Sequence, residues 1–157
     1  MKTTTTTFSQ MKIRKTMKKV IIYENRKTPP RVFDISTEKK EKEAYQLLFE
    51  IFEHWNVFSY LNQIERKKGE LEKYKNPEFR NEDQVFVDFG DGYAKQYSED
   101  EWEEEIEEME REIKTLETKK EMYEGAKSGD QEAIESLIRQ EKGKPYTSYR
   151  IVEVENS

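Results

Sequence analysis

Residues 98–125 read SEDEWEEEIEEMEREIKTLETKKEMYEG, and this stretch decides the fold. Its large apolar side chains recur at alternating steps of four and three positions. The positions of this seam are Trp102, Ile106, Met109, Ile113, Leu116, Lys120 and Tyr123. Such spacing predicts a helix that packs lengthwise against another helix. Ser98 and Glu101 have the S-x-x-E spacing of a capping box, so we expect the helix to begin there and to run to about Glu124.

A second helical segment, residues 37–75, contains the candidate partner, which is the part from Phe58 to Tyr74. Its apolar side chains form two stripes that are out of phase around residues 54–59, which predicts a break there. The first stripe is Ala44, Leu48, Ile51, Trp55 and Phe58, and the second is Tyr60, Ile64, Leu71 and Tyr74, with Lys67 between. Ser36 or Thr37 is the expected N-cap, and Asn76-Pro77 ends the segment. An intermolecular partner would give the same seam, so a homodimer stays open.

Four runs of residues have the character of strands. Residues 18–23 (KKVIIY) and 31–35 (RVFDI) predict a hairpin, and residues 146–154 (YTSYRIVEV) predict a last strand that joins it. Residues 84–97 contain Gly90-Asp91-Gly92 between two alternating runs and predict a second hairpin. A short helix is expected from Asp130 to Glu141, packed through Ile134, Leu137 and Ile138.

These elements define an α+β fold class. We expect a small antiparallel sheet, made of the N-terminal hairpin and the C-terminal strand, and a long antiparallel helical hairpin interrupted by a β-hairpin. Residues 18–157 are expected to form a single domain with a helical projection at about 57–125. Residues 1–17 are expected to be a disordered, basic leader, because the first 23 residues hold six bases and no acid. Translation could also begin at Met11 or Met17.

Most kinds of catalytic site are excluded by composition. The chain has no cysteine and one histidine, His54, which we expect to be a half-buried structural residue. Carboxylates abound, so no pair stands out as general acid and base. Asp88-Phe89-Gly90 lacks every other kinase motif and is interpreted as a turn. We therefore expect a non-enzyme with no catalytic residue, no cofactor and no metal, and no segment that spans a membrane.

The charge is concentrated in one helix. Residues 98–112 contain ten acids and one base, a net charge of −9, whereas the whole chain carries −6 and the remainder therefore +3. Acids in the first turn favour the helix dipole, but those beyond it repel one another. The spacing of about one net charge per 2.5 Å is of the same order as duplex DNA. The candidate partner-binding residues are Asp100, Glu103, Glu104, Glu107, Glu108, Glu110 and Glu112. A merely solvated helix face would look the same.

The expected function is that of a non-catalytic inhibitor or adaptor, whose acidic helix binds the basic surface of a host protein. That partner would be a nucleic-acid-binding protein such as a nuclease or effector. The alternative is a nucleic-acid-binding accessory protein that uses the basic N-terminal tail. Direct nucleic-acid binding is not expected, because neither the leader nor Arg66-Lys67-Lys68 has aromatic residues interleaved.

A short Lys/Glu-rich chain without cysteine, with clustered methionines at Met1, Met11 and Met17 and a dense acidic helix at residues 99–112, resembles a class of small accessory proteins. These are encoded by phages and mobile elements of Gram-positive bacteria and include anti-CRISPR proteins. Composition carries the resemblance, and no functional residue is transferred by it. It implies an anti-defence, stoichiometric inhibitor in the cytoplasm of a bacterial host, which often occupies a nucleic-acid-binding surface.

Overall fold

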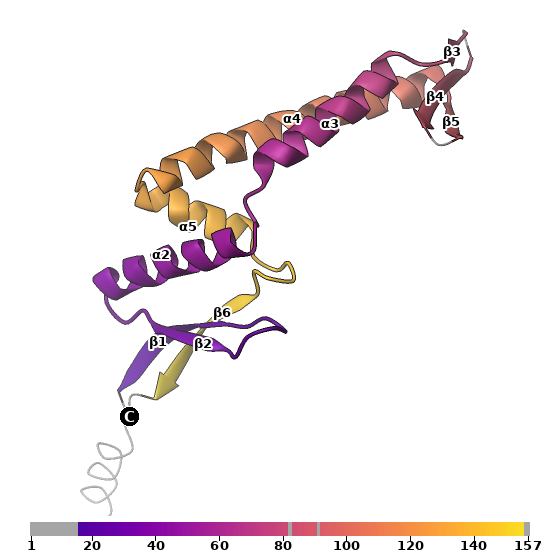
Figure 1. Ribbon diagram of the computed structural model, residues 1–157. Coiled ribbons are helices and arrows are strands. Elements are labelled where there is room, and N and C mark those ends of the chain that lie inside the picture. The colour runs from indigo at the N-terminus through magenta and orange to yellow at the C-terminus, as the bar shows by residue number, and fades with distance from the viewer. Residues whose placement is uncertain (1–15, 82, 91, 156–157) are drawn as a thin grey trace, which may run out of the picture. The chain divides into compact units, whose positions relative to one another are not determined.

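The computed structural model describes residues 16–81, 83–90 and 92–155 (Figure 1). The elements in chain order are β1 (Met17–Tyr23), β2 (Arg31–Asp34), α2 (Glu38–His54), α3 (Tyr60–Lys75), β3 (Phe79–Arg80), β4 (Val85–Gly90), β5 (Tyr93–Tyr97), α4 (Glu99–Lys127), α5 (Gln131–Gln140) and β6 (Tyr149–Glu155). The predicted α+β class is confirmed. The chain divides into two compact units. Unit 1 comprises the described residues up to Val57 and those from Gly129, and unit 2 is Phe58–Ser128.

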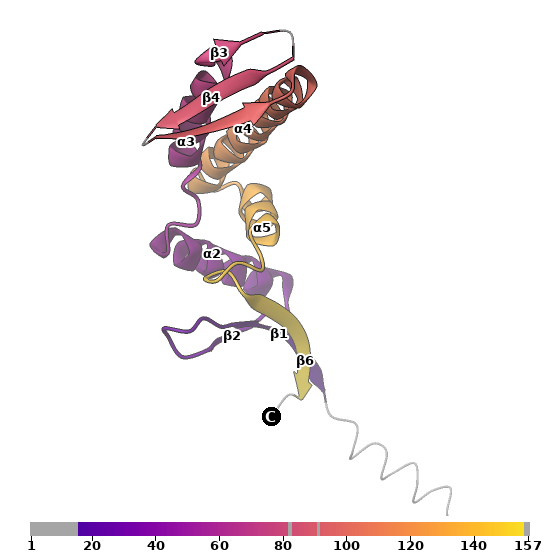
Figure 2. The same ribbon diagram turned by 90° about the vertical axis from the view of Figure 1, so that its right-hand side faces the viewer.

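Unit 1 contains an antiparallel sheet of strand order β2-β1-β6. Ile21 in the central strand lies opposite Phe33 on one side and Ile151 on the other. The hairpin and the joining C-terminal strand were both predicted. Strand β1 begins at Met17, which we had assigned to the leader, and residues 1–15 of that leader lie outside the described residues. Views from two sides show α2 over one face of the sheet and α5 beside α2 (Figures 1 and 2).

Helix α2 begins where the sequence predicts, because the Thr37 hydroxyl accepts a hydrogen bond from the Lys40 amide at 3.2 Å. It ends at His54, and Asn56 adopts a positive φ of 56°, so the predicted break is confirmed. The predicted apolar stripe was partly wrong, since Ile51 and Trp55 are only half-buried. The buried residues of the helix are Ala44, Tyr45, Leu48, Phe49 and Phe52. This buried face is wider because the helix packs against both the sheet and α5.

Unit 2 is built on an antiparallel pair of helices, α3 and α4, joined through the small sheet β3-β4-β5. The turn of the predicted hairpin has Gly90 and Gly92 at positive φ, a conformation that costs other residues steric strain. The seam of α4 packs on α3 of the same chain, which confirms the intramolecular helical hairpin. Its buried members are Trp102, Met109 and Ile113, and its half-buried members are Ile106, Leu116, Lys120 and Tyr123.

Local signals set the ends of the helices. The Ser98 hydroxyl accepts from the Glu101 amide at 3.2 Å, as the capping box predicts, and α4 runs to Lys127. Asp130 caps α5, which buries Ile134, Leu137 and Ile138 as expected. Unit 2 has bounds close to those of the predicted projection at about 57–125. Whether the two units behave as one cooperative domain stays a prediction.

Candidate functional site

The outer side of α4 carries a row of exposed carboxylates, which we call the acidic face: Asp100, Glu103, Glu104, Glu107 and Glu108. At 100° per residue, Glu104 and Glu107 project away from the seam that contains Trp102 and Met109. None of the five forms an ion pair with any residue that the structure describes. The acidic face therefore carries negative charges that no ion pair neutralises, although the charge of Glu103 helps to raise the pKa of Arg80 and that of Glu108 helps to raise the pKa of Lys67.

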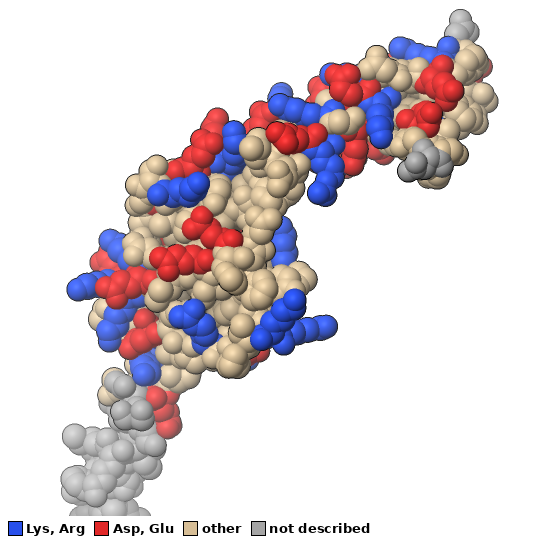
Figure 3. All heavy atoms as spheres, viewed as in Figure 1, with Lys and Arg blue, Asp and Glu red and all other residues tan. Residues whose placement is uncertain are grey.

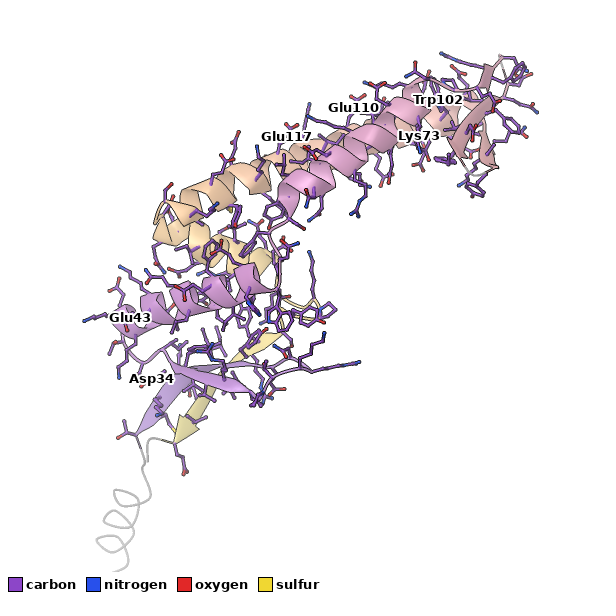
Figure 4. The ribbon with its side chains drawn as sticks, in the orientation of Figure 1. Asp34, Glu43, Lys73, Trp102, Glu110 and Glu117 are labelled. Atoms are coloured by element: carbon purple, nitrogen blue, oxygen red, sulfur yellow. The ribbon has the colours of Figure 1, made fainter. Side chains whose placement is uncertain are left out.

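Other acids of the same helix are paired with bases of α3 and β3. Lys67 lies 2.6 Å from Glu112 and Lys75 lies 3.7 Å from Glu110. The remaining pairs on this flank are Lys68 with Glu117 and Arg80 with Glu99. Figure 3 accordingly shows positive and negative side chains intermingled along the visible side of α3 and α4, and Figure 4 labels Glu110 and Glu117. Glu110 and Glu112, which we predicted to contact a partner, each pair with a lysine of α3, and their contact with a partner stays a prediction.

The hydrogen bond from Lys67 to Glu112 raises the pKa of the lysine. The charges of Glu112, Glu70 and Glu108 act in the same direction, against the effect of desolvation. Glu108 thus contributes to the field around Lys67 without making an ion pair. Exposed pairs of this kind contribute about 0–1 kcal/mol each to stability. The packing of the seam, rather than these pairs, therefore supplies most of the stability of the helical hairpin.

The charges of the acidic face are closely spaced along the helix axis. Asp100 and Glu108 are eight positions apart, about 12 Å along a helix, so the five charges are about 3 Å apart on average. Duplex DNA presents one charge per about 1.7 Å of axis. A pocket of about 440 Å³ adjoins this face and is lined by Glu108, Arg111 and Leu116 among others. The pocket offers a partly apolar floor beside the carboxylates.

The residues weighed for chemistry do not converge. His54 is exposed, so the expectation of a half-buried residue was wrong. Its ring forms a T-shaped contact with the ring of Trp55, with centroids 5.1 Å apart. The buried hydroxyls of Tyr74 and Tyr97 bond to each other at 2.7 Å. Within the described parts of the chain, no group of three His, Asp or Glu side chains is placed to hold a metal ion.

Sequence reasoning identified the acidic helix but not which acids are neutralised. Lys67 and Lys68 were considered as phosphate contacts, whereas both pair with acids of α4. The signal was present in part, because an antiparallel α3–α4 pair brings the bases of residues 66–75 opposite the acids of residues 110–117. The register that selects Glu110 and Glu112 could not be obtained without the structure.

No protein-family model matches the chain, and no significant match was found among curated proteins or solved structures. None of the helices in the described ranges combines the length and apolar character that crossing a bilayer requires.

Proposed function

We propose that this protein is a non-catalytic inhibitor or adaptor that binds another protein through the acidic face of α4. The observation that carries the proposal is that Glu104, Glu107 and their exposed neighbours form no ion pair with any described residue, although other acids of α4 do. Carboxylates this close repel one another, and the helix dipole compensates only those of the first turn. A surface rich in Lys and Arg would relieve that repulsion.

The partner that suits this face is a basic, nucleic-acid-binding protein. The charge spacing of the acidic face is of the same order as that of duplex DNA, so the face can occupy a surface that normally binds phosphates. A nuclease or other effector of a bacterial host has such a surface. This proposal agrees with the resemblance to anti-defence proteins of phages and mobile elements, which act stoichiometrically in the host cytoplasm.

The test is affinity capture from a nuclease-treated bacterial lysate with three forms of the full chain as bait. In the test variant, Glu103, Glu104, Glu107 and Glu108 are all replaced by Lys. Glu110 and Glu112 are left in place, because reversing them would break the ion pairs to Lys75 and Lys67 and confuse stability with binding. Circular dichroism checks that each form is folded.

The matched control reverses four other exposed acids, Glu43, Glu65, Glu78 and Glu121, none of which has an ion pair with a described residue. It has the same net charge as the test variant but keeps the acidic face. We expect the parent and the control to capture a basic protein that the test variant loses, and high salt to release it. If all three baits captured the same proteins, the acidic face would have no role in binding and would be only a solvated helix face.

The alternative function, nucleic-acid binding by the basic N-terminal tail, is distinguished by deleting residues 1–15. These residues lie outside the described part of the chain. If the tail is the binding element, deletion abolishes recovery of nucleic acid from an untreated lysate, while the charge reversal on α4 does not weaken it. If our proposal is right, the charge reversal on α4 abolishes capture of the basic protein, whereas deletion of residues 1–15 does not weaken it.

A further inference from the structure

Three segments of unit 1 that are far apart in sequence meet at a pair of aromatic rings. Trp55 follows the last residue of α2, and Tyr146 lies in the loop between α5 and β6. Their rings stack with centroids 4.5 Å apart and planes 11° apart. Lys27, from the β1–β2 loop, places its Nζ 5.9 Å from both ring centroids. Both rings are half-buried and thus keep exposed surface.

The β1–β2 loop is held in place next to this stack. The Glu24 amide donates to the Ser148 carbonyl oxygen at 3.1 Å, and the Tyr23 hydroxyl donates to the Tyr146 carbonyl oxygen at 2.8 Å. Within the loop, the Asn25 side-chain oxygen accepts from the amides of Lys27 and Thr28 at 2.7 and 2.8 Å. The backbone at Lys27 is therefore ordered before any ligand arrives, which lowers the entropic cost of binding.

The α5–β6 loop is equally well ordered by its own hydrogen bonds. The Thr147 hydroxyl accepts from the Lys144 amide at 2.9 Å, and the Thr147 amide donates to the Lys144 carbonyl oxygen at 3.1 Å. Gly143 has a φ of 97°, which a residue with a Cβ rarely adopts. These constraints present Tyr146 from a closed, compact loop.

Two pockets adjoin the stack. Trp55 lines a pocket of about 380 Å³, Tyr146 lines one of about 720 Å³, and Asn25 lines both. The larger pocket is also lined by Arg26, Lys27 and Lys144. Its volume lies within the range of about 300–1,000 Å³ that is common for ligand sites. The space beside the rings is thus large enough for a nucleotide-sized group, with cations at its rim.

The two loops, together with the first residues of the strands β2 and β6 that follow them, form a positive region in an acidic protein. Residues 24–31 and 141–150 together contain six bases and two acids, a net charge of +4, whereas the chain carries −6. Lys144 pairs with the buried Glu141, and Arg150 lies 3.4 Å from Glu24. Arg26 and Lys27 are exposed and pair with no acid among the described residues. Figure 3 shows the Lys and Arg side chains of this region gathered at the right of unit 1.

We propose that the Trp55–Tyr146 stack, with Arg26 and Lys27, is a binding site for single-stranded nucleic acid. Aromatic surface and unpaired cations together are the elements that such sites use: bases stack on the rings, and phosphates contact the cations. An acidic peptide would satisfy the cations but would not use the rings. In a duplex the base faces are already stacked, so only the phosphates could contribute. This site is independent of the acidic face of α4.

The first test measures the fluorescence anisotropy of a short labelled oligothymidylate with the full chain, over salt concentrations between about 50 and 200 mM. The test variant is Arg26→Ala with Lys27→Ala. Its matched control, Lys39→Ala with Arg66→Ala, removes one exposed Lys and one exposed Arg that have no ion pair with a described residue. Lys144 is avoided, since its loss would leave the buried Glu141 unpaired.

We expect the parent and the control to bind alike and the test variant to bind more weakly. The slope of log K against log salt should be shallower by about 1.4 in the test variant, because two phosphate contacts are lost at about 0.7 each for single strands. Absence of binding by the parent, or equal binding by the test variant and the control, would overturn the proposal. Because both variants retain residues 1–15, binding by the leader cannot produce the expected difference.

The second test asks whether bases stack on the rings. The chain has two tryptophans, so Trp102→Phe leaves Trp55 as the only one and makes its fluorescence a specific reporter. We expect the oligothymidylate to quench this fluorescence, and an abasic oligonucleotide of the same length to bind at least about fivefold more weakly. An unchanged Trp55 signal at saturation, or equal affinity for the abasic strand, would mean that the rings do not contact bases.

Discussion

The indole nitrogen of Trp102 donates a hydrogen bond to the main-chain oxygen of Tyr74 at 2.8 Å. Trp102 lies in the first turn of α4, and Tyr74 lies in the last turn of α3. The bond therefore joins the two helices at the end of unit 2 that carries the sheet, where Figure 4 labels Trp102. Carbonyl groups in the last turn of a helix have no partner within the helix, so the indole satisfies an acceptor that burial would otherwise leave unpaired.

Replacing Trp102 by Phe is expected to lower the free energy of unfolding by about 1–3 kcal/mol, the cost of leaving a buried acceptor unsatisfied. The aromatic ring stays, so most of the packing is retained. The midpoint of denaturant unfolding, followed by circular dichroism, measures the change. An unchanged midpoint with an unchanged slope would mean that water replaces the indole without cost.

Replacing Ile113 by Ala should remove a buried side chain from the seam between α3 and α4, since Ile113 is only 7% exposed. Large-to-small changes in a core cost about 2–5 kcal/mol. The adjacent Lys114→Ala is the control, because Lys114 is exposed and such changes stay within about 0.5 kcal/mol. Equal unfolding midpoints for the two variants would contradict the seam.

Acid should weaken the interactions of Asp34, the last residue of β2, with Ser36 and Lys40 at the start of α2. Hydrogen bonds from the side chain and the backbone amide of Ser36, with a smaller effect of Lys40, lower the pKa of Asp34 to about 2. Since the unfolded value is about 3.9, the contribution of Asp34 is present above pH 4 and disappears as the pH falls towards 2. We expect Asp34→Ala to be less stable than the parent at neutral pH and equal to it near pH 2. Lys40→Ala, which keeps both bonds to Ser36, should show a smaller difference.

Alkali should reveal buried tyrosines. Burial raises the pKa of Tyr149 to about 12, and burial together with the bond to Tyr97 raises the pKa of Tyr74 further. Because the folded state favours the neutral phenol, the stability linked to Tyr149 is present below pH 10 and is lost as the pH rises through about 12. Ultraviolet titration should show a late phase that Tyr149→Phe diminishes. If Tyr149→Phe instead diminished the absorbance change near pH 10, the Tyr149 ring would be exposed to water in the parent protein.

The fold was predictable where local chemistry decides it. Ser98 with Glu101, the glycines at 90 and 92, and Asn76-Pro77 each fix a boundary through bonds or backbone conformations within a few residues. The side of α2 that is buried was less predictable, because two neighbours cover it. Phe49 and Phe52 are in the core, whereas Ile51 and Trp55 line a pocket instead.

The candidate sites were likewise predictable only in the parts that local sequence decides. A run of acids is visible in any reading of residues 98–112, but its division into paired and unpaired members depends on the register of α3 against α4. The stack of Trp55 on Tyr146 has no local signal at all, because the two rings come from different loops of unit 1. Single-sequence patterns report periodicity within a segment, and neither of these features lies within one segment.

Unit 1 is discontinuous in the chain, and this has a consequence for synthesis on the ribosome. Central strand β1 pairs over seven residues with β6, which emerges only after unit 2 has been made. At translation rates of about 5–20 residues per second, that delay is roughly 6–25 s. Unit 2 is continuous and can fold first, while Val20–Tyr23 waits with one unpaired edge, the kind of strand that recruits other chains. Newly made copies therefore pass through an interval in which this edge is open to pairing with a strand of another chain.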